Sequence, residues 1–204
     1  MLSVHDLAAR RGHARLFAEV AFTLASGQAL LVTGANGTGK TTLLRILAGL
    51  TAPDLGETRW EGRAYRPFDE RIREVVAFAG HAPALKDELT TVENLAVLAA
   101  LGGARPTPAD LDDALAAVSL SRQRALPARA LSQGQRRRIG LARLHIVRRP
   151  LWILDEPVTA LDTAGTALME SLIAAHLAAG GLAVAAIHQP LGLAPERCAR
   201  LALS

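Results

Sequence analysis

Cysteine is almost missing from this 204-residue chain, which carries a single one, Cys198. One cysteine permits no disulfide within the chain, and this usage fits a reducing compartment such as the cytosol. No run of about 18 apolar residues is free of charge, so the sequence predicts no membrane-spanning helix. The opening residues also lack the charged-then-apolar layout of a secretory signal. These absences predict a soluble cytoplasmic protein, with enough chain for one domain and a sizeable core.

Aromatic side chains and lysines are scarce as well. Aromatic residues make up 3% of the chain, which leaves few rings for stacking nucleic acid bases, so no nucleic acid partner is expected. Among the 23 lysines and arginines, only Lys40 and Lys86 are lysines. The arginines cluster at 136–138 and 148–149, a pattern compatible with solvated faces, with anionic lipid headgroups and with an acidic partner. The formal net charge of +4 does not choose among these.

The scarcity of lysine draws attention to Lys40, which lies in a glycine-rich loop between an apolar stretch at 29–33 and a leucine-rich stretch at 43–50. The loop follows the G-x-x-x-x-G-K-[ST] pattern, in which backbone N–H groups and a helix N-terminus surround phosphates. The lysine offers a compact ammonium to the terminal phosphates, and the Thr41 hydroxyl can ligate Mg²⁺. We therefore expect a nucleoside triphosphate to bind here. The predicted nucleotide-binding residues are Gly34, Ala35, Asn36, Gly37, Thr38, Gly39, Lys40, Thr41 and Thr42.

A pair of adjacent carboxylates, Asp155 and Glu156, follows the apolar stretch 151–154. Carboxylates at the C-terminal end of a buried strand lie where doubly wound sheets place their ligands. There Asp155 can hold hydrated Mg²⁺, while Glu156 can orient and polarise a water for attack on the terminal phosphate. We therefore predict Asp155 as a metal ligand together with Thr41, and Glu156 as a catalytic residue.

A second phosphate-binding surface is predicted at the start of a helix that follows Ser132, the residue in position to cap it. A serine hydroxyl, a glycine backbone and a helix N-terminus together suit a phosphate. Because one subunit does not need two such surfaces for one terminal phosphate, we expect this one to act on a nucleotide held by a second copy of the chain. Its residues are Leu131, Ser132, Gln133, Gly134 and Gln135.

In order and spacing these motifs, together with Ala160-Leu161-Asp162 and His188, resemble those of the ABC-type ATPases over nearly the whole chain. The resemblance implies an α/β fold, a P-loop NTPase of ABC type with a RecA-like core and an inserted helical subdomain. It implies a head-to-tail dimer that sandwiches two ATP molecules, with Mg²⁺, between the Lys40 loop of one copy and the signature 131–135 of the other. It also assigns Asp162 to the D-loop and His188 to the terminal-phosphate region as a catalytic residue.

The same resemblance divides the single predicted domain, 1–204, into two parts. Residues 1–85 and 150–204 are expected to form the catalytic core with a β-subdomain, and residues 86–149 the helical subdomain with the signature helix. Two helical patterns, around 91–101 and 108–118, flank a Gly-Gly and proline turn. In the family this subdomain receives a short helix from a membrane subunit. Because little chain follows His188, we expect neither a regulatory tail nor a second cassette.

An expected single cassette without a regulatory tail favours the ATP-hydrolysing subunit of a membrane transport complex whose transmembrane parts are separate chains. Non-transport ABC ATPases of ribosomes or DNA resemble tandem cassettes or cassettes split by coiled coils, and the sequence shows neither. A small-molecule kinase would not need the signature at 131–135. The ATP-binding subunit of a different ABC exporter stays open as an alternative.

His81 stands at a predicted strand end where most ABC ATPases carry a glutamine, in a loop that Pro83 would stiffen. With the stretch AIHQPL at 186–191 and the short length, this resembles the ATP-binding subunits of bacterial haem exporters for cytochrome c biogenesis. The resemblance implies a peripheral subunit on the cytoplasmic side of the inner membrane, docked on integral-membrane subunits, whose ATP hydrolysis drives haem handling. His81 is then a predicted catalytic-site sensor that links nucleotide and membrane subunit. No haem site is expected in the cassette itself.

The family usually stacks adenine on an aromatic residue upstream of the phosphate loop. Here Arg11 stands near that place, with His13 close by. An arginine can stack on a base but defines base recognition less sharply, so the selectivity for ATP over GTP is left open by the sequence.

Overall fold

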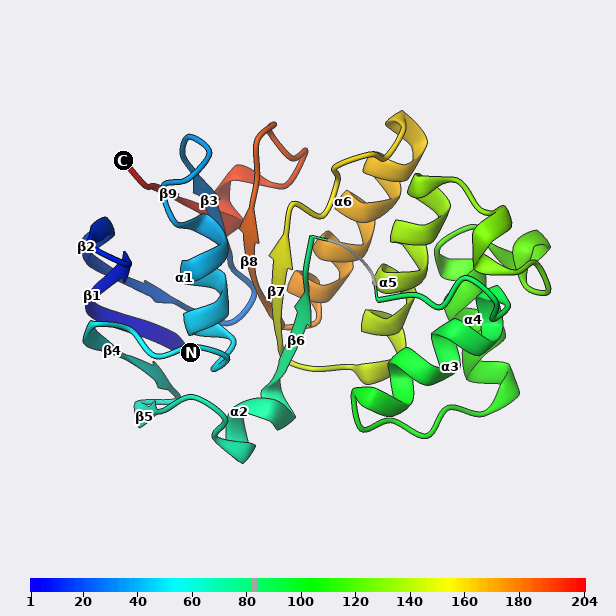
Figure 1. The fold of residues 1–204 in the computed structure, drawn as a ribbon, viewed down its shortest axis with the longest axis horizontal. Helices are drawn as coiled ribbons and strands as arrows, with labels where there is room; N and C mark the ends of the chain where they lie inside the picture. Colours follow the sequence, from blue (N-terminus) through cyan, green and yellow to red (C-terminus); the bar gives the residue numbers. More distant parts are fainter. Residues whose placement is uncertain (82–83) are drawn as a thin grey trace. The chain divides into compact units, whose positions relative to one another are not determined.

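The computed structural model describes residues 1–81 and 84–204, which form two compact units (Figure 1). The chain passes between the units four times: within strand β6 (Val76–Ala79), between Arg148 and Arg149, between Pro157 and Val158, and within helix α6 (Thr163–Ala178). The sheet unit comprises Met1–Phe78, Arg149–Pro157 and Glu170–Ser204, and the helical unit comprises Ala79–Arg148 and Val158–Met169.

A five-stranded sheet in the order β6-β7-β8-β3-β9 forms the centre of the sheet unit. β3 pairs in parallel with β8 and β9, and β7 pairs in parallel with β8. Every residue of β7 and β8 is buried, as expected for parallel strands covered on both faces. Helix α1 (Lys40–Leu47) packs against β7 and β8. The remaining elements are β3 (Ala29–Thr33), β7 (Leu151–Asp155), β8 (Leu182–Ala186), the short η3 (Pro195–Arg197) and β9 (Cys198–Ala202).

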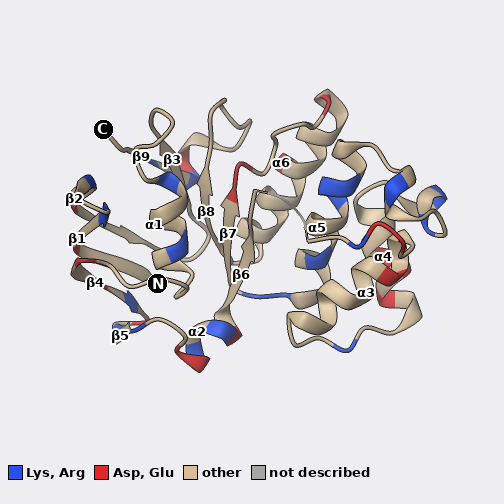
Figure 2. Ribbon diagram, viewed as in Figure 1, with Lys and Arg blue, Asp and Glu red and all other residues tan. Residues whose placement is uncertain are grey.

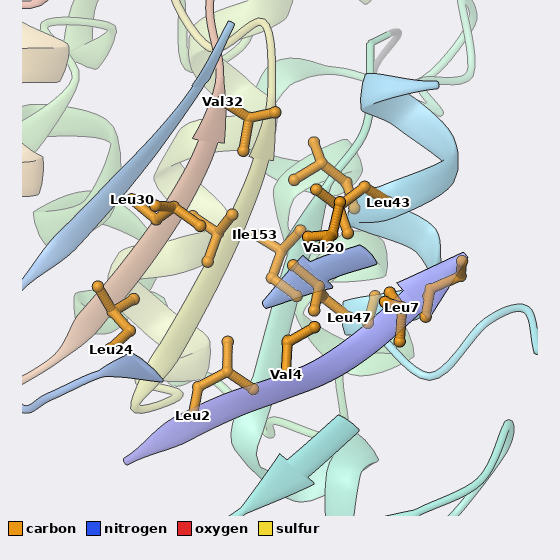
Figure 3. Close-up of a cluster of buried hydrophobic side chains, with 14 of the residues drawn as sticks. Leu2, Val4, Leu7, Val20, Leu24, Leu30, Val32, Leu43, Leu47 and Ile153 are labelled. Carbon is orange, nitrogen blue, oxygen red and sulfur yellow. The ribbon is translucent and has the colours of Figure 1, made fainter. Parts of the chain in front are cut away.

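A second, four-stranded antiparallel sheet in the order β2-β1-β4-β5 belongs to the same unit. Its elements are β1 (Leu2–Arg11), β2 (Ala14–Leu24), β4 (Leu55–Trp60) and β5 (Arg63–Tyr65), followed by helix α2 (Glu70–Val75). Leucine and valine side chains of β1 and β2 join those of β3 and α1 in one buried cluster, which Figure 3 shows around Leu47 and Ile153. Because apolar burial is the main favourable term in folding, this shared cluster ties the two sheets together.

The helical unit is built mainly from α3 (Thr91–Leu101), α4 (Pro108–Ala117) and α5 (Gln133–Val147), with the short η1 (Ser121–Gln123) and η2 (Ala128–Ala130) between α4 and α5. Helices α3 and α4 both pack against α5. Each of these helices begins with a capping box, in which the N-cap hydroxyl accepts one backbone N–H and a side chain on the first turn accepts the N–H of the cap. The paired residues are Thr90 with Glu93, Thr107 with Asp110 and Ser132 with Gln135.

An aromatic stack joins β7 to the part of α6 that belongs to the sheet unit. The rings of Trp152 and His176 lie with centroids 3.9 Å apart and planes inclined by 8°. His176 Nε2 also lies 3.1 Å from the carbonyl oxygen of Leu182. Burial lowers the pKa of His176, because the charged imidazolium would lose its water. Burial at this position therefore favours the neutral ring.

The structure confirms the predicted α/β class with a parallel sheet. The helical patterns predicted around 91–101 and 108–118 correspond to α3 and α4, and the apolar stretch at 29–33 is β3. Within residues 1–81 and 84–204, no helix has the length and apolar content needed to cross a membrane.

Candidate nucleotide-binding and catalytic site

The predicted phosphate loop leads directly from the end of β3 into the first turn of α1. Its glycines take positive φ angles, 147° at Gly34, 90° at Gly37 and 99° at Gly39, which residues with a Cβ disfavour. A Cβ on Gly39 would lie 2.9 Å from side-chain atoms of Leu16 and Phe17 in β2. Glycine is therefore required where the loop curls tightly against β2, and such a curl before a helix is the arrangement that surrounds a phosphate with N–H groups.

Lys40 opens α1 and turns its side chain back over the loop. Its Nζ donates hydrogen bonds to the carbonyl oxygens of Gly34 at 2.7 Å and Ala35 at 3.0 Å. Lys40 is only 7% exposed, so these acceptors offset the cost of removing an ammonium from water. The other predicted residues lie beside it, with Asn36 exposed in the loop, Thr38 donating to the Ala35 carbonyl, and Thr42 in α1. The positive charge is thus held over the loop, where a phosphate oxygen would be a stronger acceptor than either carbonyl.

Thr41 of α1 and Asp155 at the end of β7 meet, although 114 residues separate them in sequence. The Thr41 hydroxyl donates to Asp155 Oδ2 at 3.0 Å, and Asp155 is 4% exposed. Hydroxyl and carboxylate oxygens are hard ligands of the kind that Mg²⁺ prefers, and Mg²⁺ usually takes waters and phosphate oxygens as its other ligands. The two predicted metal ligands therefore fit this ion in both chemistry and placement.

Glu156 and His188 also meet, after β7 and β8 respectively. His188 Nε2 lies 2.8 Å from Glu156 Oε1. Glu156 takes a positive φ of 52°, a conformation that costs a non-glycine residue about 1–3 kcal/mol. Its N–H donates to the carbonyl of Ala186 at 3.1 Å, which holds the residue beside the strand that leads to His188. The structure thus places the predicted catalytic carboxylate in contact with the predicted catalytic histidine.

The predicted signature forms the start of α5 in the helical unit. Ser132 Oγ accepts the Gln135 N–H at 3.2 Å, and the Gln135 side chain accepts the Ser132 N–H at 2.9 Å. Gln133 and Gly134 follow the cap in the first turn, and Asp162 caps the next helix by accepting the Gly165 N–H at 2.7 Å. A hollow of about 310 Å³ is lined by Ser132, Gln133, Gly134, Arg138, Ala160, Leu161 and Asp162. The signature and the predicted D-loop residue therefore share one concave surface.

The remaining predicted residues lie at element ends. His81 follows β6 in the helical unit with its side chain exposed, and its backbone carbonyl accepts a hydrogen bond from the Arg137 guanidinium of α5. Pro83, predicted to stiffen this loop, lies outside the described residues. Leu131 is buried immediately before the cap of α5. Arg11 ends β1 and His13 stands in the turn to β2, both of them exposed.

Two arginines of α5 belong to these features although the sequence did not single them out individually. Arg138 lines the hollow together with Gly134, which precedes it by four residues, the spacing that places two residues on one helix face. Helical spacing could therefore have indicated Arg138. Arg137 is 9% exposed and bonds to the carbonyl of His81, 56 residues away. No local pattern in the sequence links that pair.

Residues 17–159 match the protein family described as ABC transporter. The "Cytochrome c biogenesis ATP-binding export protein CcmA" of Nitrosomonas europaea is 43% identical over 204 residues, which cover 100% of this chain and 96% of the relative. The protein of the same name from Pseudomonas aeruginosa is 45% identical over 202 residues, covering 98% of this chain and 97% of the relative.

Solved structures share the fold. A putative ABC transporter ATP-binding protein from Pyrococcus furiosus matches with a TM-score of 0.83 at 23% identity, covering 98% of this chain and 96% of that one. A dimeric ATP-binding cassette in a post-hydrolysis state, bound to ADP and Pi, matches with a TM-score of 0.78 at 22% identity, covering 93% of this chain and 88% of that one. These likenesses confirm the ABC-type nucleotide-binding fold. With the full-length relatives they establish that the chain belongs to the ABC transporter family and, within it, to the cytochrome c biogenesis ATP-binding export proteins named CcmA.

Proposed function

We propose that this chain is the ATP-hydrolysing subunit of a membrane export complex that serves cytochrome c biogenesis and handles haem. The observation that carries the proposal is the arrangement at the ends of three neighbouring strands, β3, β7 and β8. Lys40, the Thr41–Asp155 pair and the Glu156–His188 pair all follow these strand ends. The near full-length similarity to export proteins of this family supports the same conclusion.

The side chains divide the work of hydrolysis among them. The loop N–H groups and Lys40 bind the phosphates of ATP, and Thr41 with Asp155 would hold Mg²⁺. Bound Mg²⁺ supplies positive charge that neutralises the phosphate oxygens. The Glu156 carboxylate orients a water and takes up its proton, while His188 holds that carboxylate through Oε1. Positioning and electrostatic stabilisation, rather than covalent chemistry, then account for the rate.

A second copy of the chain completes the site in this proposal. The signature, Ser132 to Gln135, and Asp162 would act on the nucleotide held by the Lys40 loop of the other copy. The helix N-terminus of α5 favours a negatively charged ligand, and the hollow beside it provides space for one. The dimeric, ADP-bound cassette of the same fold supports such an assembly.

Separate integral-membrane subunits are the other proposed partners, and they would hold this peripheral chain at the cytoplasmic face of the inner membrane. Residues 1–85 and 150–204 would act as the catalytic core, and residues 86–149 as the subdomain that receives a helix from the membrane subunit. His81, in place of the usual glutamine, would sense the nucleotide for that subunit. We expect haem to be bound outside this chain, and we expect no nucleic acid partner.

Complementation of a strain that lacks its own copy of this subunit tests the proposal. The wild-type chain should restore the yield of matured cytochrome c, whereas Lys40→Ala should not, because the phosphates lose their ammonium partner. Lys86→Ala is the matched control, because Lys86 is the other lysine of the chain and is exposed. Membrane fractionation should find the wild-type chain in the membrane pellet only when the membrane subunits are co-expressed. Full complementation by Lys40→Ala, or no recruitment by the membrane subunits, would contradict the proposal.

A further inference from the structure

The loop that follows β8 carries His188, and a side chain of α6 holds its backbone. Glu170 of α6 accepts the N–H of Gly192 through Oε1 at 2.6 Å. Figure 2 draws α6 almost wholly in tan, and Glu170 is the one Asp, Glu, Lys or Arg residue in the sequence of this helix. Both residues belong to the sheet unit, as do His188 and Glu156. A single carboxylate of α6 therefore contacts the loop that supplies the predicted catalytic histidine.

The loop approaches Glu170 so closely that a glycine is needed there. A Cβ on Gly192 would lie 3.0 Å from Glu170 Oε2 and 3.3 Å from its Cδ. The φ angle of Gly192 is not positive, so this glycine serves to make room rather than to allow an unusual backbone conformation. A carboxylate that accepts an N–H forms a charge-assisted hydrogen bond, which is stronger than a bond between neutral groups. Glu170 is also half-buried, so water competes less for its carboxylate than at a fully exposed site.

The backbone between His188 and Gly192 has little conformational freedom. The ring of Pro190 fixes its own φ, and it confines the preceding Gln189 to extended conformations. Leu191 follows with its side chain buried. A shift of Gly192 therefore passes along the loop to His188, because the residues between them cannot absorb it.

The other side of His188 is fixed to the central sheet. The N–H of Ile187 donates to a backbone carbonyl of β3 at 3.0 Å, and Ile187 is buried. Burial of Leu191 also holds the loop, but apolar burial is non-directional and does not define the position of each backbone atom. A hydrogen bond does so, because it constrains both a distance and an angle. The bond to Glu170 is therefore the contact that sets the course of the loop after His188.

A second contact attaches the far end of the same segment to α6. Arg197 of η3 donates through Nη1 to the carbonyl of Leu177 at 3.2 Å. Leu177 follows Glu170 by about two helical turns, the spacing that places two residues on one helix face. Residues 192–197 are thus attached to one face of α6 at both ends, and Glu170 provides the attachment that is nearer to His188.

We propose that Glu170 is a positioning residue for His188 in ATP hydrolysis. By holding the Gly192 N–H, it keeps the loop where His188 Nε2 lies 2.8 Å from Glu156 Oε1. The inference rests on the function proposed above and adds a residue to it. Glu170 acts through His188 and does not contact the nucleotide, so its loss affects the orientation of the Glu156 carboxylate rather than the binding of ATP.

Steady-state kinetics of the complex reconstituted with its membrane subunits provide the first test. Glu170→Ala should lower kcat about fivefold, the loss expected for one partly exposed hydrogen bond. The KM for ATP should change less than about twofold, because the phosphates are held by Lys40 and its loop. Glu170→Gln keeps an oxygen that can accept the N–H, so its kcat should stay within about twofold of the wild type. Glu196→Ala removes a carboxylate from an exposed position in η3 and should match the wild type.

A spectroscopic measurement on the isolated chain reports the position of His188 without reference to activity. The chain has six histidines, and His188→Ala identifies the imidazole proton resonance of His188 by its loss. Glu170→Ala should shift that resonance, whereas Glu196→Ala should leave it in place. Gly192→Ala should shift it by a smaller amount, because the new Cβ displaces the Glu170 carboxylate without removing it.

A double substitution determines whether Glu170 acts through His188. In the His188→Ala background, Glu170→Ala should lower kcat by less than about twofold more, and a further loss of about fivefold would overturn the inference. An unchanged kcat in Glu170→Ala alone would also overturn it. So would a lowered unfolding temperature with an unshifted His188 resonance, which would limit Glu170 to support of the fold. Absence of ATP hydrolysis by the wild-type complex would instead overturn the proposed function, and the His188 resonance would then decide by itself whether Glu170 positions this histidine.

Discussion

The two units assemble their functional residues by different means. In the sheet unit, side chains from distant segments contact one another, as in the Thr41–Asp155 and Glu156–His188 pairs. In the helical unit, Ser132 and Gln135 are neighbours that satisfy each other's backbone at the start of α5. Strand ends therefore gather a reactive set from several segments, whereas a capped helix presents one continuous surface. Substitutions in the two units should therefore impair ATP hydrolysis in different ways.

The largest effect is expected at Glu156 in the sheet unit. Glu156→Gln keeps the shape of the side chain and loses the carboxylate that orients the water, so ATP hydrolysis should fall about 10²- to 10³-fold. ATP binding should survive, and the variant should accumulate as an ATP-held dimer that size-exclusion chromatography detects. Glu88→Gln, at an exposed residue of the helical unit, is the control. Wild-type turnover in Glu156→Gln would remove the residue from the catalytic role.

Lys40→Ala and Gly134→Asp compare the two units directly. Lys40→Ala should weaken ATP binding by the isolated chain about ten- to hundredfold, the loss expected for hydrogen bonds to a charged group. Gly134→Asp should leave that affinity unchanged and block dimerisation, because even a Cβ there lies 3.0 Å from the Ala160 carbonyl and the carboxylate would enter the hollow. Nucleotide titration of the dilute chain and ATPase assays measure both.

Mixing the two variants sharpens the same comparison. A mixed dimer of Lys40→Ala and Gly134→Asp chains rebuilds at most one complete site, so activity should be partial at best. Reduced ATP affinity in isolated Gly134→Asp would mean that the signature serves the nucleotide of its own chain.

His81 lies in the helical unit but is proposed to sense the bound nucleotide. His81→Ala should retain ATP binding and dimer assembly, while hydrolysis stimulated by the membrane subunits falls. His81→Gln should be the mildest replacement, because it restores an amide oxygen of suitable reach. ATPase activity of the reconstituted complex and the yield of matured cytochrome c measure the effect. An unaltered response in His81→Ala would return the residue to an ordinary loop position.

Two equivalent capping boxes separate stability from function. Ser132→Ala and Thr107→Ala each remove an N-cap hydroxyl and should lower the free energy of unfolding by about 1 kcal/mol. Only Ser132→Ala should also reduce ATP hydrolysis, since Thr107 caps α4 outside the hollow. Chemical denaturation and ATPase assays provide the two readouts. Equal ATP hydrolysis by the two variants would limit Ser132 to its role as the N-cap of α5.

The smallest effect is expected from His176, whose pKa burial lowers. The fold therefore favours the neutral ring, and the unfolded chain binds the extra proton first as the pH falls. The stability contributed by this residue is complete above the unfolded pKa of about 6.5 and is lost as the pH drops toward the lower, folded pKa. Unfolding temperatures measured between about pH 8 and about pH 5 should fall less steeply in His176→Phe, which can still stack on Trp152. An unchanged slope would contradict this assignment.

The site features that depend on a short motif could be predicted from the sequence. The loop around Lys40, the carboxylates after β7 and the cap at Ser132 are local patterns, and the structure shows each in the expected element. The contact between Arg137 and the His81 carbonyl could not be predicted, because it joins backbone and side chain across 56 residues. The positive φ of Glu156 could not be predicted from the sequence either, because the tertiary fold overrides the preference of a non-glycine residue for negative φ.

The placement of Trp152, which stacks on His176, determines what the intrinsic fluorescence of the chain reports. The chain has two tryptophans, Trp60 in β4 and Trp152 in β7, and both belong to the sheet unit. Intrinsic fluorescence therefore reports on that unit alone. Trp152 lies three residues before Asp155 on the same strand, so its emission provides a label-free optical probe at the strand that carries the carboxylates.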